Sequence, residues 1–372
     1  MSLRLKGRPV ALATALLGGL ALMAPGTAVA HRSHPPRTDL AVQQVNLVSD
    51  LPGKAALTDP DLVNPWGLSL GATTPLWVSN NGTASSTLYT SPPGATTATK
   101  VPTVRVDVPP LPTGQVNNPT TGFVLTKGQV SAPARFIFAT QNGKIAAWGP
   151  PVSPLIGAAQ IKASVRGAVY TGLAIATDRH VTRLYAANFA QRRIDVFNHK
   201  FHLVKQPRWA FQDRHLPKGY APFNVQTLQG RIFVAYAKVD PATGEQQAGR
   251  GLGFVDEYTP TGRLVDRVVA RGSLNAPWGL AIAPSSWGKL AGALLVGNFG
   301  DGRINVVLPK PHHRFDHRIF GQLTNGHGHT LVIPGLWALL QGTATTGGTD
   351  SIFFSAGIDD ENHGLLGVLR HP

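Results

Sequence analysis

The stretch Asn-Pro-Trp-Gly-Leu-Ser-Leu at residues 64–70 returns nearly unchanged as Asn-Ala-Pro-Trp-Gly-Leu-Ala-Ile at residues 275–282. After each copy comes a second apolar stretch that ends in Asn and Gly, at residues 76–82 and 294–300. A third stretch of alternating residues follows at 86–90 and 303–307. Self-similarity of this kind is the sequence signature of a repeat architecture. The chain is therefore predicted to use one strand-rich unit several times.

Weaker copies bring the number of predicted units to six. Their openings fall near residues 66, 122, 172, 223, 278 and 336, and each unit leaves room for a fourth strand. Fourth strands are expected at 101–106, 203–211, 264–269 and 314–321. Four short antiparallel strands per repeat, separated by turn residues, are typical of a propeller blade. The predicted fold is all-β, a six-bladed β-propeller of four-stranded antiparallel blades.

The two ends of the chain are predicted to meet in one blade. The last unit stops at Pro372 after only three strands, whereas residues 41–48 form an alternating strand with no partner nearby in sequence. We expect this early strand to complete the last blade and close the ring, because closure removes a sheet edge that would otherwise pair with other chains. Residues 41–372 then form a single domain.

The composition excludes several other classes of protein. The 41 Gly and 30 Pro among 372 residues would break helices repeatedly, which argues against a helical bundle. The absence of Cys excludes disulfides, thiolate metal sites and a cysteine nucleophile. No nucleophile elbow, P-loop or HExxH motif is present, so neither a Ser-His-Asp hydrolase nor a nucleotide-binding enzyme is indicated.

The net charge of +15 at pH 7 comes from basic residues spread along the chain. Such a charge raises encounter rates with polyanions, for example cell-wall phosphate polymers or acidic glycans. Nucleic acid is not expected as a partner, because the basic residues are not interleaved with aromatic residues that form a binding platform.

The first thirty residues have the layout of a secretory signal peptide. Three basic residues between positions 4 and 8 precede an apolar run at 10–24, and the small residues Ala-Val-Ala at 28–30 form a cleavage site. Pro25 ends the run before it reaches the roughly 20 apolar residues that a membrane span needs. We expect a signal peptide at 1–30, a disordered basic linker at 31–40, and a secreted protein without a transmembrane segment.

The repeated openings also resemble a known group of proteins. Openings with Gly-Leu, second strands that end in Asn or Asp, and third strands of the form Arg-Ile-x-Val-Phe resemble the NHL-type and TolB-like six-bladed propellers. The opening at 64–68, its echo at 276–280 and the closing stretch at 357–367 are more similar still to a family of secreted bacterial propellers with no assigned activity. The resemblance implies a fold and no particular function, because propellers host lactonases, lyases, lectins and binding platforms alike.

Polar and aromatic residues are expected to surround one mouth of the central channel. In a propeller, the loops that lead into the first strand and those that join the second and third strands emerge on the same face. For the asparagines, the alternative is tolerance of tight turns; for the tryptophans, it is a wedge between blades, which their repetition favours. The predicted ligand-binding residues are Asn80, Asn142, Asn188, Asn224, Trp66 and Trp278.

The run Asp-Asp-Glu-Asn-His at 359–363 holds four ionisable groups, more than a turn requires. Carboxylate and amide oxygens are hard ligands that suit Ca²⁺, and we predict a metal set of Asp359, Glu361, Asn298 and Asp301. Resemblance to the six-bladed gluconolactonase-like enzymes implies a comparable Glu/Asn/Asn/Asp site, although no matching Glu aligns in the first blade. Glu361 and His363 are the predicted acid–base residues.

Two functions stay open from the sequence. One is a secreted binding or scaffold module at the cell envelope, with a small molecule or glycan at the channel mouth and a cell-wall polyanion as a further partner. The other is a Ca²⁺-dependent hydrolase or lactonase with its site at the same mouth, where the metal polarises a carbonyl or activates water.

Overall fold

The computed structural model describes residues 38–310 and 314–372. The predicted signal peptide (1–30) and most of the predicted linker (31–40) therefore lie outside the described residues. Within the described part, strands β1 to β29 dominate and only two short 3-10 turns occur, η1 (Thr38–Leu40) and η2 (Gly288–Leu290). No helix in this part is long and apolar enough to cross a bilayer.

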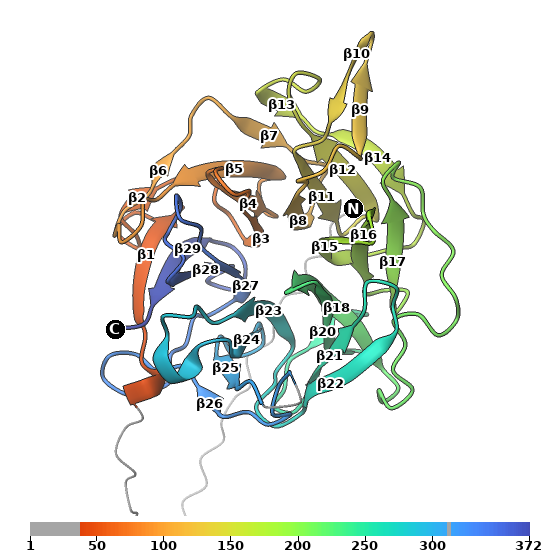
Figure 1. The fold of residues 1–372 in the computed structure, drawn as a ribbon. Coiled ribbons are helices and arrows are strands. Elements are labelled where there is room, and N and C mark those ends of the chain that lie inside the picture. Colours follow the sequence, from red (N-terminus) through yellow and green to blue (C-terminus); the bar gives the residue numbers. More distant parts are fainter. Residues whose placement is uncertain (1–37, 311–313) are drawn as a thin grey trace, which may run out of the picture. The chain divides into compact units, whose positions relative to one another are not determined.

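Six mainly antiparallel sheets form a six-bladed β-propeller, as predicted (Figure 1). The innermost strand of each blade faces the centre of the ring, and each inner strand contacts the inner strands of the two neighbouring blades. These six inner strands are β3 (Pro65–Ser69), β8 (Pro112–Asn117), β15 (Tyr170–Asp178), β18 (Tyr220–Leu228), β23 (Pro277–Ile282) and β27 (Leu336–Gln341).

The first three blades differ in how their outer strands are built. Blade 1 continues with β4 (Leu76–Asn80), β5 (Ser85–Thr90), β6 (Thr99–Lys100) and β7 (Arg105–Asp107), and β13 (Ile156–Ala158) pairs in parallel with β7. Blade 2 continues with β11 (Phe136–Thr140), β12 (Lys144–Trp148) and β14 (Gln160–Ser164). Blade 3 has only β16 (Val181–Asn188) and β17 (Arg193–Asn198) after its inner strand.

The last three blades are completed as follows. Blade 4 contains β19 (Arg231–Val239), β20 (Gln246–Gln247), β21 (Gly253–Tyr258) and β22 (Leu264–Ala270). Blade 5 contains β24 (Leu294–Asn298), β25 (Ile304–Val307) and β26 (Gly321–Gln322). Blade 6 contains β28 (Ser351–Ala356), β29 (Leu365–Arg370), β1 (Gln43–Ser49) and β2 (Leu57–Thr58).

The prediction that an early strand closes the ring is confirmed. Strand β1 pairs antiparallel with β29, from Gln43 opposite Arg370 to Ser49 opposite Leu365. Figure 1 shows these two strands, from opposite ends of the chain, side by side in blade 6. Leu47 and Val368 on these strands belong to one apolar cluster with Trp66 and Trp337 of the inner strands.

Two details of the predicted blades are wrong. The second unit does not open at 121–124; its inner strand is β8, and residues after 123 form a separate hairpin, β9 (Val124–Lys127) with β10 (Val130–Pro133), that projects from the ring (Figure 1). Residues 203–211 form no strand, because the segment turns at Pro207, which has no N–H to offer a sheet. The stretches 101–106 and 314–321 contribute only the short outer strands β7 and β26.

Glycines on the inner strands set the width of the ring. A Cβ atom added at Gly67, Gly114 or Gly279 would lie less than 3.0 Å from main-chain atoms of the next blade's inner strand. This close approach explains the Gly that follows Trp in two of the repeated openings. The cavity enclosed by the six inner strands is about 10 Å³, too small for anything larger than a single water. The centre of the ring is therefore packed rather than open.

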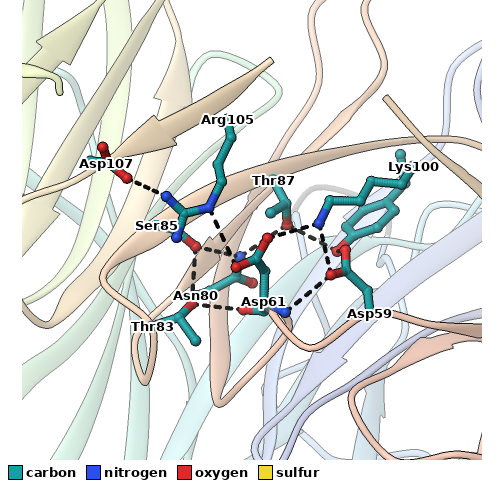
Figure 2. A network of polar contacts seen from close by, with 10 residues as sticks. Asp59, Asp61, Asn80, Thr83, Ser85, Thr87, Lys100, Arg105 and Asp107 are labelled. Atoms are coloured by element: carbon teal, nitrogen blue, oxygen red, sulfur yellow. Dashed lines mark hydrogen bonds and ion pairs between the residues drawn. The ribbon is translucent and has the colours of Figure 1, made fainter. Parts of the chain in front are cut away.

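A polar network fastens the link between the last blade and the first. Lys100 Nζ lies 2.8 Å from both Asp59 Oδ1 and Asp61 Oδ2, and Tyr89 donates its hydroxyl hydrogen to Asp59 Oδ2 at 2.7 Å (Figure 2). Burial alone would raise the pKa of Asp61, but the hydrogen bond and charge of Lys100, with Arg105, hold that pKa below its ordinary value. The link from β2 to β3 is thus held against blade 1 by charge as well as by packing.

The close contact at Gly114 predicts a severe effect of one added methyl group. Gly114→Ala should abolish soluble folded protein or lower the melting temperature by about 10 °C or more, since the new Cβ meets the main chain at Leu173. Gly326→Ala is the matched control, because Gly326 has no neighbouring atom within 4 Å and an ordinary φ. Thermal unfolding followed by circular dichroism measures both. Equal melting temperatures for the two variants would contradict a ring width set by glycine.

Candidate ligand site at the channel mouth

A pocket of about 430 Å³ lies at the end of the ring where the predicted site loops emerge. The loops between second and third strands of blades 4, 5 and 6 supply most of its walls, and the segment that leads into β27 completes it. Its lining residues are Ala248, Phe299, Gly300, Asp301, Gly302, Val332, Pro334, Gly335, Gly357, Asp359, Asp360 and Glu361.

An aromatic stack closes the pocket toward the centre of the ring. The Phe299 ring stacks on Trp337 with centroids 4.1 Å apart, and Trp337 stacks on Trp66 at 3.5 Å. Trp278 meets both indoles edge to face. Because the channel below is filled, the pocket is blind, and a molecule can enter and leave only through the mouth.

Trp66 and Trp278, predicted as ligand-binding residues, are buried inside this stack. Trp278 donates its indole N–H to the carbonyl of Thr171 in blade 3 at 2.9 Å, which ties two blades together. These contacts favour the alternative interpretation, in which both rings pack between blades. Phe299, which was not among the predicted site residues, is the half-buried aromatic residue that lines the pocket.

The acidic wall of the pocket has a strained backbone. Asp359, Asp360 and Glu361 have φ values of 51°, 54° and 65°, three consecutive left-handed residues without a glycine. Residues other than Gly visit this region at a cost, and such strain concentrates at functional sites. The turn is held by hydrogen bonds from Asn362 N to Asp359 O and from His363 N to Ile358 O, both 3.2 Å.

Glu361 is oriented by a chain of hydrogen bonds that reaches the aromatic stack. Asn64 donates from Nδ2 to Glu361 Oε2 at 2.8 Å, and Trp337 donates from Nε1 to Asn64 Oδ1 at 3.0 Å. Burial raises the pKa of Glu361, and the negative charges of Glu245 and Asp360 raise it further, while the bond from Asn64 opposes this shift. The carboxylate is therefore fixed in position in surroundings that disfavour its charged form.

The predicted metal set is brought only partly together. Asp301, Asp359 and Glu361 line the same pocket, but Asn298 is buried beneath it. The Asn298 amide donates to Ser273 O and Asp301 Oδ1, and it accepts from Asn275 N and Asn305 Nδ2, so all four of its hydrogen-bonding positions are used. Within residues 38–310 and 314–372, no group of three or more His, Asp or Glu side chains is arranged to hold a metal ion.

Most of the predicted ring of asparagines has a structural role. Asn80, Asn188 and Asn224 are buried, and Asn224 donates to the carbonyl of Trp278 at 2.7 Å. Asn142 is exposed, bonds to Thr140 and does not line the pocket. The asparagine that ends a second strand pairs with a residue seven positions later in the third strand: Asn80–Thr87, Asn188–Asp195 and Asn298–Asn305, at 2.9, 2.8 and 3.1 Å.

His363, the second predicted acid–base residue, does not line the pocket with Glu361. Its Nδ1 lies 2.7 Å from Asp50 Oδ2, just after β1, and Asp50 Oδ1 accepts the main-chain N–H of Gly364. The two predicted catalytic residues thus have separate partners, and His363 joins the last blade to the strand that closes it.

No family model matches the chain, but two viral proteins are similar to it over most of its length. Uncharacterized protein R648 of Acanthamoeba polyphaga mimivirus is 32% identical over 346 residues, 90% of this chain and 82% of that protein. Uncharacterized protein L690 of the same virus is 33% identical over 345 residues, 90% of this chain and 87% of that protein. The chain belongs to the family of these two mimivirus proteins.

R648 and L690 are both viral proteins, whereas the repeat motifs of this chain resemble those of secreted bacterial propellers. Kinship with that bacterial family stays a prediction. Among solved structures, a streptogramin B lyase has a TM-score of 0.48 and 10% identity, over 89% of this chain and 97% of the lyase. The activity of the lyase is therefore not assigned to this chain or to R648 and L690.

The raised pKa of Glu361 predicts a pH-dependent effect of Glu361→Gln on stability. The pKa of Glu361 is 4.5 in the unfolded chain and higher in the folded protein. As pH rises through the range between these two pKa values, the carboxyl lowers the free energy of unfolding progressively. Glutamine keeps the bond from Asn64 without the buried charge. The variant should therefore melt about 1–3 °C above the parent near pH 7.5 and at the same temperature near pH 4.

Thermal unfolding across this pH range measures the effect of Glu361→Gln. Asp178→Asn, which removes a half-buried carboxylate outside the pocket, is the control for loss of a carboxylate elsewhere in the fold. A lower melting temperature for Glu361→Gln near pH 7.5 would mean that the ionised carboxylate stabilises the loop.

Proposed function

We propose that this propeller is a binding module that holds a small polar molecule or the end of a glycan in the mouth pocket. The observation that carries the proposal is a blind cavity of about 430 Å³ with an aromatic floor and an acidic wall. Its volume is in the range of pockets that enclose small ligands. A blind pocket favours capture of a ligand over passage through the ring.

The chemistry of the lining narrows the class of ligand. Asp301, Asp359, Asp360 and Glu361 supply hydrogen-bond acceptors and negative charge, and among the residues that the structure describes no Lys, Arg or His lines the pocket. Phe299 offers a ring that suits the apolar face of a sugar or an ammonium group. Ligands rich in hydroxyl or amino donors, such as amino sugars, fit this combination better than anions do.

The calcium-dependent hydrolase has weaker support than the binding module. The carboxylates line one pocket, but Asn298 is fully hydrogen-bonded within the protein and His363 is paired with Asp50. A metal at the mouth would therefore have to take its ligands from Asp301, Asp359 and Glu361 with little help from neighbouring amides. These carboxylates would serve equally to bind an amino or hydroxyl group.

A ligand screen by thermal shift and calorimetry tests the proposal. A panel of neutral sugars, amino sugars and short glycans should contain members that raise the melting temperature by several degrees at saturation. The double variant Asp301→Asn, Glu361→Gln should weaken their binding about tenfold or more, and Asp178→Asn should leave it unchanged. Absence of any binding member, or binding that survives the double variant, would refute the mouth pocket as the site. A Ca²⁺-dependent rise in melting temperature that the double variant removes would support the hydrolase instead.

Export is the second part of the proposed function, and it rests on the signal-like layout of residues 1–30. We expect a bacterial host that produces the full chain to release a mature protein that begins at His31, where the basic stretch starts. Mass spectrometry of the amino-terminal peptide from culture medium or cell envelope measures this. An intact Met1 terminus in the cytosol would refute export.

A further inference from the structure

A second and larger hollow lies between blades 2 and 3, with a volume of about 780 Å³. It is formed by the link from β8 to β9, by β14, by the turn between β15 and β16, and by the loop after β17. Successive strands in a blade are antiparallel, so the loops emerge alternately at the two ends of the ring. The turns that follow first and third strands therefore lie at the end opposite the mouth pocket. We call this hollow the basic groove.

The basic groove is lined by lysines and histidines, and no carboxylate of the described residues lines it. Lys162, His180, His199 and Lys200 contribute to its walls, together with threonine hydroxyls such as that of Thr121. None of these four basic side chains forms an ion pair within the described part of the chain, whereas Lys100 and Arg267 each bind two carboxylates. The charges of Lys162 and Lys200, gathered in a hollow without compensating carboxylates, create a positive potential that attracts an anion.

The basic side chains are presented on a rigid frame. Phe123 donates its main-chain N–H to His199 O at 2.7 Å, and the Phe123 ring packs against Phe201 at 5.1 Å between centroids. Asn198 Oδ1 accepts the main-chain N–H of Lys200 at 2.9 Å, which fixes the loop. Lys162 Nζ lies over the Phe201 ring at 5.6 Å. Because the loop is ordered, binding an anion here costs little conformational entropy.

We propose that the basic groove binds a run of phosphate groups in an extended polymer. Lysine, histidine and threonine all donate hydrogen bonds to phosphate oxygens, and charged donors make the stronger ones. Single-stranded nucleic acids bind by stacking bases on exposed aromatic rings, but Phe201, the aromatic side chain in this groove, is buried. The groove therefore fits the backbone of a phosphate polymer and offers no platform for bases. This site is independent of the mouth pocket and of the ligand proposed there.

Binding of labelled inorganic polyphosphate to the mature chain, followed by fluorescence anisotropy at about 50 and about 200 mM salt, tests the proposal. The double variant Lys162→Glu, Lys200→Glu should weaken binding about tenfold or more at the lower salt concentration. Lys54→Glu, Arg263→Glu is the matched control: both residues are exposed, neither forms an ion pair within the described residues, and the change in net charge is the same. The control should weaken binding less than about threefold.

Three results would overturn the proposal: no binding of polyphosphate at the lower salt concentration, an equal loss in the control variant, or groove-dependent binding of dextran sulfate or DNA without binding of polyphosphate. Circular dichroism confirms that both double variants are folded. Because the substituted side chains lie on the surface, a folded variant that has lost binding assigns the loss to the groove. A milder variant, Lys162→Gln with Lys200→Gln, gives a second reading with an expected loss of about threefold or more.

Discussion

The contact between neighbouring inner strands is the constraint on which the rest of this propeller depends. At Gly67, Gly114 and Gly279 the main chain of one blade touches the main chain of the next, and no side chain larger than hydrogen fits between them. Six blades can then meet around a centre that holds almost no empty space. Because the centre is filled, the mouth of the ring does not open into a channel. It is instead a pocket that is closed at its inner end.

The two hollows at opposite ends of the ring differ in chemical character. The mouth pocket is walled by four carboxylates, and the basic groove is walled by two lysines and two histidines. The alternation of strand direction within each blade produces this separation, since it assigns one set of loops to each end. The net charge of the whole chain, +15, does not reveal this difference between the two hollows. The positions of the loops bring four carboxylates into one hollow and two lysines and two histidines into the other.

The sequence predicted the architecture well because repetition carries that information. Each blade needs an inner strand that packs closely on its neighbours and a second strand that is bonded to the third. These requirements produce the similar openings at 64–70 and 275–282, and the asparagines that end second strands. The alternating pattern of β1 likewise reflects its place in a blade. The second blade was misplaced because its inner strand, β8, lacks the Trp-Gly pair, while residues 121–124 imitate an opening and belong to the link and hairpin instead.

The same repetition limited prediction of the site. Asn80, Asn188 and Asn298 recur because each holds the third strand of its own blade, so their repetition indicates structure rather than ligand binding. The acidic loop at 359–361 is unique to the last blade, and its composition alone drew attention to it. Phe299 and Asn64 were not recognised as its partners, since they come from other blades and only the folded ring brings them together.

The pairing of β1 with β29 also determines when the ring can close during synthesis. Ser49 binds the carbonyl of Gly364, which lies 315 positions further along the chain. At translation rates of about 5–20 residues per second, the closing strand waits roughly 15–60 seconds for its partner. Throughout that interval β1 lacks its antiparallel partner β29 and can pair only with the short parallel strand β2, and the five earlier blades form an open arc. Completion of this fold is therefore a late step that depends on contacts between residues very far apart in the sequence.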